Sequence, residues 1–209
     1  MTTGRSIENR NDDAADCIVD RRLALALLSA TPVLAMLTSA AGAQTAGPAM
    51  SRTTAFAFSF EGLDGGRLRL VEHAGKPILI VNTASLCGFT PQYAGLQNLW
   101  TRYRERGLLV IGVPSNDFGG QEPGGPAEIN KTAHDDYHID FPLTAKAAVK
   151  GDAAHPFYKW AALERPGATP QWNFHKYLVG RDGHIAASFG SRVDPKDPSV
   201  IAAIERELP

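Results

Sequence analysis

Cysteine is nearly absent from this chain, which has only Cys17 and Cys87 among its 209 residues. Cys17 lies in an N-terminal stretch that has the pattern of a removable leader, so one thiol remains in the rest of the chain. A single thiol cannot form an intramolecular disulfide, which excludes a disulfide-stapled fold. Stability must therefore come from packing, and Cys87 is either a reactive thiol or an inert buried one.

Long apolar runs and an excess of charge of one sign are also missing. The apolar stretch from Leu23 to Leu37 contains Pro32 and is too short for a comfortable membrane span. Lys and Arg number 21 against 22 Asp and Glu, and no basic cluster interleaves with aromatic residues. We therefore expect neither a nucleic-acid partner nor stable membrane insertion.

The N-terminal stretch itself has the three parts of a secretory signal peptide. Arg21-Arg22 precede the apolar core, and the small residues Ala41-Gly42-Ala43 close it. We interpret residues 1–43 as a cleaved signal peptide, with an uncleaved anchor as the alternative, and expect a periplasmic or secreted protein. Residues 44–55 have the composition of a linker, and residues 56–209 have the length of one domain.

From residue 56 onward, helical and strand signals alternate. The near-continuous apolar run 77–83 is typical of a central strand covered on both faces. Thr90 as N-cap and Pro91 as first helical residue would open a helix. Further strands are expected at 108–113, 176–179 and 184–189, and further helices at 127–137, 155–163 and 197–208. This order favours an α/β fold, with a central sheet flanked by helices.

Cys87 lies where the expected central strand ends and the next helix begins. The unpaired N–H groups and the positive dipole end of a helix stabilise a thiolate at such a junction. Gly88 follows and lets other backbone approach closely. The residues alone leave open whether this thiol is reactive or a small buried hydrophobe.

Neutral hydrogen-bond donors stand in two later loops. Gln121 belongs to a Gly-rich loop, and Trp172 and Asn173 precede the strand expected at 176–179. Such donors could hold a thiolate and a developing hydroxide if both loops reach the same end of the sheet. Taken singly, a turn-capping Gln and a core Trp are the commoner roles.

Three blocks of the sequence together carry a specific resemblance. They are Val81–Thr90 (VNTASLCGFT), Phe118–Pro123 (FGGQEP) and Trp172–Phe174 (WNF), supported by His155–Tyr158 and Phe141–Leu143. In order and spacing the blocks resemble the signatures of the glutathione peroxidase family. The resemblance extends from about Phe56 to the end of the chain.

The resemblance implies a thioredoxin-like fold and a peroxidase without cofactor or metal. Its catalytic tetrad falls on Cys87, Gln121, Trp172 and Asn173. Cys87 would reduce hydrogen peroxide and organic or lipid hydroperoxides and become a sulfenic acid. An external thiol such as glutathione, or a thiol protein, would then regenerate it through a mixed disulfide.

Two departures from the family pattern refine this expectation. Thioredoxin-dependent members carry a resolving cysteine where this chain has Ala133, and Ser115 occupies another position often held by cysteine. Regeneration should therefore need an external thiol.

Tetrameric members insert a long loop before the Trp-Asn block, whereas only eight residues separate Leu163 from Trp172 here. We therefore expect a monomer with an open active-site surface.

Two other functions are consistent with parts of the sequence. An exported redox sensor would share the reactive thiol, and a thiol or metal-binding module of the same fold would normally need two close cysteines and a histidine. His134 and His138 stand four residues apart on an expected helix and could form a metal pair. Because no third ligand stands near them in the sequence, the pattern favours two histidines on a solvated helix face over a metal site.

Overall fold

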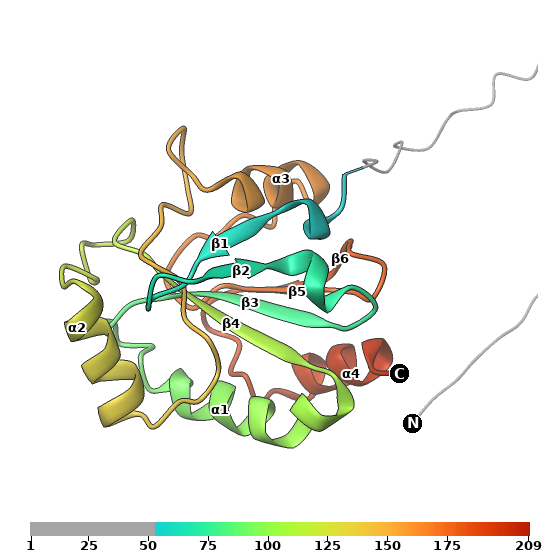
Figure 1. The fold of residues 1–209 in the computed structure, drawn as a ribbon, viewed down its shortest axis with the longest axis horizontal. Coiled ribbons are helices and arrows are strands. Elements are labelled where there is room, and N and C mark those ends of the chain that lie inside the picture. The colour runs from blue at the N-terminus through green and yellow to red at the C-terminus, as the bar shows by residue number, and fades with distance from the viewer. Residues whose placement is uncertain (1–52) are drawn as a thin grey trace, which may run out of the picture. The chain divides into compact units, whose positions relative to one another are not determined.

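The computed structural model describes residues 53–209, which fold around a four-stranded mixed sheet (Figure 1). The strand order is β4-β3-β5-β6. β4 runs parallel to β3, whereas β5 is antiparallel to β3 and β6 antiparallel to β5. The strands are β3 (Ile78–Thr83), β4 (Leu109–Pro114), β5 (Lys176–Val179) and β6 (Ile185–Phe189).

Helices and a small hairpin complete the domain. The hairpin pairs β1 (Ser59–Glu61) with β2 (Arg67–Arg69), flanked by the 3-10 turns η1 (Ala55–Ala57) and η2 (Leu70–His73). The helices are α1 (Gln92–Tyr103), continued by the 3-10 turn η3 (Arg104–Arg106), α2 (Pro126–Asn130), the π-helix η4 (Lys131–Asp136), α3 (Pro156–Glu164) and α4 (Pro198–Glu207).

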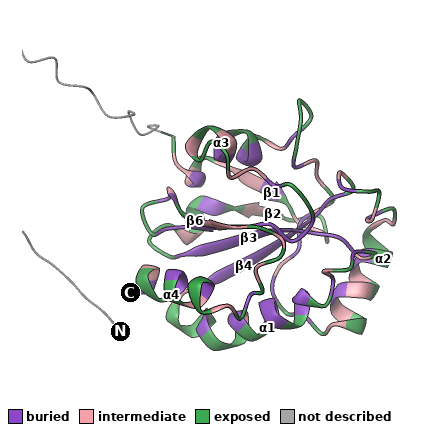
Figure 2. Cartoon of the chain, turned by 180° about the vertical axis from the view of Figure 1, so that it is seen from behind, coloured by how far each residue is buried: buried purple, intermediate pink, exposed green. Residues whose placement is uncertain are grey.

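Two apolar clusters lie on opposite faces of the sheet. α1 and α4 cover one face, while α3 and the hairpin lie on the other (Figure 1). Along β3, Leu79 and Val81 belong to the first cluster and Ile78 and Ile80 to the second. Side chains of a strand alternate between faces, so a strand covered on both sides is apolar throughout. All six residues of β3 are buried, as the purple ribbon in Figure 2 shows.

The predicted α/β architecture, a mixed central sheet flanked by helices, is thus confirmed. The predicted signal peptide lies outside the described residues. The packed domain extends at least to Thr53, whose carbonyl accepts the Trp160 indole N–H at 3.0 Å. Ala55, assigned to the linker from composition, is fully buried. No helix within residues 53–209 is long and apolar enough to span a bilayer.

One helix differs from expectation. The segment predicted as a regular helix over 127–137 is α2 for one turn and then becomes the π-helix η4. The Tyr137 N–H donates to the Thr132 carbonyl, five residues back. The π-helix η4 ends before Phe141, which is buried in the apolar cluster on the α1 and α4 face of the sheet. Helix propensities do not distinguish a π turn from an α turn, so the sequence could not show this change.

Candidate active site

Cys87 lies in the turn between β3 and α1, with 7% of its surface exposed. The Phe89 backbone N–H donates to the Cys87 sulfur at 3.4 Å. A backbone N–H in this position can stabilise negative charge that develops on the sulfur during a reaction. The sulfur therefore has a backbone donor aimed at it, although most of its surface is covered.

Thr90 builds this turn rather than capping the helix, so its predicted N-cap role is wrong. Its hydroxyl accepts the Cys87 N–H at 3.1 Å and lies 2.8 Å from the Ala84 carbonyl. α1 starts at Gln92, and Pro91 precedes it without a side-chain cap. The hydroxyl is used inside the cysteine turn, which fixes the backbone on both sides of the sulfur.

The loop that carries Gln121 is tied directly to the cysteine turn. The Leu86 N–H donates to the Gln121 carbonyl at 3.0 Å, and the Ser85 N–H to Glu122 Oε2 at 2.9 Å. Burial raises the pKa of the Glu122 carboxyl, and the hydrogen bonds with Ser85 oppose the rise. These two bonds hold the backbone of Gln121 and the side chain of Glu122 against the turn of Cys87.

Gln121 and Asn173 form a side-chain pair from distant parts of the chain. Asn173 Nδ2 donates to Gln121 Oε1 at 2.9 Å and lies 3.4 Å from the Phe118 carbonyl. Because the Gln121 oxygen is engaged in this way, its amide N–H groups remain to donate. Asn173 is fully buried and Gln121 half-buried, so Asn173 holds the orientation of the more accessible amide.

Trp172 stands at the surface beside the same loop. Its indole is 39% exposed and packs on Phe118 with ring centroids 6.0 Å apart. A Cβ at Gly119 would approach the indole to 3.3 Å, and Gly119 has a φ of +67°. Both the close approach and the left-handed backbone favour glycine. All four residues predicted for the site thus lie in one connected region, joined by the Gly-rich loop.

Asn82, which sequence reasoning did not single out, holds the Trp172–Asn173 turn. Its Nδ2 donates to the Trp172 carbonyl at 3.1 Å, and its Oδ1 accepts the His175 N–H at 3.1 Å. Phe174, between them, has a φ of +63° and is buried. The available signal was an amide side chain near the end of an otherwise apolar strand.

Lys176 was likewise missed. It is fully buried at the start of β5, and its ammonium donates to Gln92 Oε1 at 2.6 Å, the Phe174 carbonyl at 2.8 Å and the Val193 carbonyl at 2.7 Å. An ammonium has three donors, and here each has an oxygen. Burial lowers the pKa of Lys176 from 10.5 to about 8. Lys176 joins α1, the Trp172–Phe174 turn and the loop after β6, and we call these contacts the lysine clasp.

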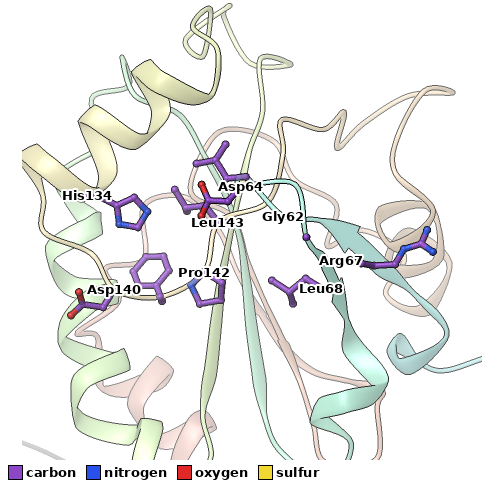
Figure 3. A pocket seen from close by; sticks show the side chains of 11 residues that line it. Gly62, Asp64, Arg67, Leu68, His134, Asp140, Pro142 and Leu143 are labelled. Atoms are coloured by element: carbon purple, nitrogen blue, oxygen red, sulfur yellow. The ribbon is translucent and has the colours of Figure 1, made fainter.

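A separate pocket of about 360 Å³ lies between the β1–β2 turn and η4, and none of the four predicted site residues lines it (Figure 3). His134 borders it, with Nδ1 2.7 Å from the Ile139 carbonyl, so this nitrogen carries the proton and donates. Within residues 53–209, no three His, Cys, Asp or Glu side chains converge on a metal position. Of the two histidines considered as a possible metal pair, His134 thus has its imidazole bonded to backbone.

Taken together, the sheet and the site define a class of protein. A thiol stands just after the end of a central strand, and a backbone N–H points at it. The loop hydrogen-bonded to its turn carries an uncharged amide that is paired with a second one. This arrangement is that of a thiol-dependent oxidoreductase whose sulfur attacks its substrate.

Comparisons with known proteins narrow the class to a family. The glutathione peroxidase family model matches residues 55–162. The hydroperoxy fatty acid reductase gpx1 of Synechocystis sp. is 44% identical over 169 residues, covering 77% of this chain and 99% of that protein. A glutathione peroxidase of Lactococcus lactis is 38% identical over 143 residues, covering 67% and 91%. The chain belongs to the glutathione peroxidase family.

Solved structures agree with this assignment. The crystal structure of Trgpx in apo form superposes with a TM-score of 0.61 at 34% identity, covering 76% of this chain and 100% of that one. A thiol:disulfide interchange protein of Chlorobium tepidum gives 0.55 at 14% identity, covering 73% and 93%, which shows the fold alone. The fold is thioredoxin-like, as predicted, and the protein is a thiol-dependent peroxidase with a thiol co-substrate and no prosthetic group.

Proposed function

We propose that Cys87, Gln121, Trp172 and Asn173 form the catalytic group of this peroxidase. The observation that carries the proposal is the hydrogen-bonded connection from the cysteine turn through Gln121 to Asn173. Cys87 is the nucleophile, and the Gln121 amide and the Trp172 indole supply N–H donors for the sulfur and the departing oxygen. Asn173 acts as a positioning residue through Gln121.

In the first step the Cys87 thiolate attacks one peroxide oxygen. A sulfur–oxygen bond forms, the O–O bond breaks, and the departing oxygen takes a proton to leave as water or an alcohol. Sulfur is oxidised to a sulfenic acid while the peroxide is reduced. One thiol then displaces water to give a mixed disulfide, and a second thiol releases its disulfide and restores Cys87. Donors aimed at the departing oxygen lower the barrier of the first step.

Replacing Gln121 with alanine tests the donor role. We expect the rate of Cys87 oxidation by hydrogen peroxide to fall about tenfold, because water can replace part of a half-exposed donor. Stopped-flow fluorescence under single-turnover conditions measures this step. Gln171→Ala is the matched control, since Gln171 is an exposed glutamine whose Nε2 donates to Thr169 instead. Equal rates for the two variants would contradict the role of Gln121.

For the substrates, we propose fatty acyl hydroperoxides in addition to hydrogen peroxide, with glutathione or another small thiol as reductant. The name of the Synechocystis relative, a hydroperoxy fatty acid reductase, supports the first part. Cys87 is the single cysteine of residues 53–209, and Ala133 is fully buried where thioredoxin-dependent members carry their resolving thiol. A partner for the sulfenic acid must therefore come from outside the domain.

We further propose that the protein is exported and works as a monomer. The basic pair Arg21-Arg22, the apolar run after it and Ala41-Gly42-Ala43 support export, and the short connection before Trp172 supports the monomer. We expect the protein in the periplasmic fraction to begin at Gln44 and to sediment as a single chain. Intact mass and sedimentation velocity of the recovered protein measure both. A retained leader would contradict export with cleavage, and a stable tetramer would contradict the monomer.

A further inference from the structure

Another pocket, of about 580 Å³, is lined by α3, by the loop before it and by the segment that leads to Trp172. None of the four residues proposed for catalysis lines it. Its walls are mainly apolar and include Phe118, Tyr158, Leu163 and Pro170. A concave apolar site of this volume suits a small organic molecule.

Two lysines give this pocket its charge. Lys150 and Lys159 line it, and among the described residues that surround it there is no Asp or Glu. Both lysines are exposed, and within residues 53–209 neither ammonium has an ion pair. The Lys150 ammonium lies 4.6 Å from the centre of the Phe118 ring, so the charge is held against the apolar wall. An apolar pocket with two unpaired cations complements an amphipathic anion.

Tyr158 adds an unpaired hydroxyl to the same wall. Tyr158 is 3% exposed, and its hydroxyl has no hydrogen-bond partner among the described residues. Burial raises the pKa of Tyr158 well above its usual range, so the hydroxyl keeps its proton and can donate it to an acceptor. Buried polar groups in native proteins are nearly always paired. A donor without a partner in the wall of a pocket therefore favours a ligand that brings an acceptor oxygen.

The pocket is connected to the proposed catalytic group through Phe118. Phe118 lines the pocket, and its ring packs on the Trp172 indole with centroids 6.0 Å apart. Beside it, Asp117 Oδ2 accepts the N–H of Val149 at 2.6 Å and the N–H of Lys150 at 3.1 Å. A ligand in the pocket would therefore contact residues that also hold the loop on which Trp172 packs.

We propose that this pocket is an effector site for an amphipathic monoanion with a medium-length alkyl chain. The chain lies along Tyr158 and Leu163, and the anionic head group meets the ammonium groups of Lys150 and Lys159. Leu163 is 82% exposed, so a bound chain removes apolar surface from water. Occupation restrains Phe118 and, through it, the Trp172 indole. This second part of the inference rests on the proposed function, which makes the indole a donor.

The binding test compares octanoate with octanol, which has the same chain without the charge. Octanoate should shift the backbone amide signals of Val149, Lys150 and Leu163 in a ¹⁵N NMR titration. We expect it to bind about fivefold more tightly than octanol, the factor for exposed ion pairs. Added salt should reduce this preference, because exposed charges are screened.

Variants of the pocket locate the site. Lys150→Met combined with Lys159→Met should abolish the preference for octanoate. Lys196→Met is the matched control, since it removes an exposed lysine from the loop before α4, and it should keep the preference. Ala162→Phe, which places a ring in the pocket from α3, should abolish the binding of both ligands. Equal affinities of wild-type protein for octanoate and octanol, or signal shifts confined to other surfaces, would overturn the site.

The effector role is tested by the rate of Cys87 oxidation by hydrogen peroxide in stopped-flow mixing. Saturating octanoate should raise this rate about twofold, because a restrained indole loses less freedom when it donates in the transition state. The double lysine variant should lack the increase. Binding of octanoate without any change in rate would overturn the effector role. Failure of Cys87 to react with any hydroperoxide would overturn the proposed function, while the NMR titration would still report on the pocket.

Discussion

Replacing Cys87 with serine is expected to lower the rate of peroxide reduction by on the order of a thousandfold or more. A serine hydroxyl is hardly ionised at neutral pH and is a much weaker nucleophile than a cysteine sulfur. The oxygen is also less polarisable than sulfur and forms no sulfenic acid. Stopped-flow mixing with hydrogen peroxide, followed by mass spectrometry of a dimedone adduct, measures both the rate and the product.

The size of the two side chains is similar, so this variant should keep the fold. A thermal unfolding temperature close to that of wild type would confirm that the loss is chemical. Ser115→Ala serves as the control, at the other position often held by cysteine in this family. The Ser115 side chain is fully buried, and its hydroxyl accepts one long hydrogen bond of 3.4 Å from the Asp117 N–H. That variant should retain most of the rate. Oxidation of Cys87→Ser at the wild-type rate would remove Cys87 from the mechanism.

The position of Cys87 could be predicted because local signals define it. An apolar run long enough for one buried strand precedes it, and Pro91 marks the approach to a helix. The structure has β3 ending at Thr83 and α1 beginning at Gln92, close to these signals. Local pattern is sufficient where a residue's role follows from the elements on either side of it.

The supports of the site could not be predicted in this way, because their partners are distant in sequence. Asn82 lies 90 residues from Trp172, and Lys176 lies 84 residues from Gln92. Nothing near Lys176 in the sequence shows that three oxygens will surround its ammonium. A lysine in a strand is ordinarily exposed, and only the assembled sheet makes this one buried.

The same reasoning explains the error at Thr90. A threonine before a proline has the pattern of an N-cap, and its hydroxyl does accept a backbone N–H. The N–H belongs to Cys87, in the preceding turn, rather than to the helix. The pattern identified a hydroxyl that bonds to backbone and assigned it to the wrong segment. The consequence is functional, because this hydroxyl fixes the turn that carries the nucleophile.

Replacing Lys176 with methionine is expected to destabilise the protein by about 3 kcal/mol at neutral pH. The methionine fills a similar volume but leaves the oxygens of Gln92, Phe174 and Val193 without their donor. Each buried acceptor without a partner costs about 1 kcal/mol or more. Denaturation by urea, followed by tryptophan fluorescence, measures the change. Lys159→Met, which removes an exposed lysine on α3, is the control and should change stability by less than about 0.5 kcal/mol.

The lysine clasp also predicts how this difference depends on pH. The pKa of Lys176 is about 8 in the folded protein and 10.5 for an unperturbed lysine, so the unfolded chain holds the proton to higher pH. Between these values the unfolded state binds more protons, and the stability contributed by Lys176 rises with pH. The wild-type advantage over Lys176→Met should therefore grow by about 1.4 kcal/mol per pH unit above pH 8. A difference that stays constant from pH 7 to about pH 9.5 would show that this ammonium does not lose its proton early, and that its three hydrogen bonds outweigh the effect of burial.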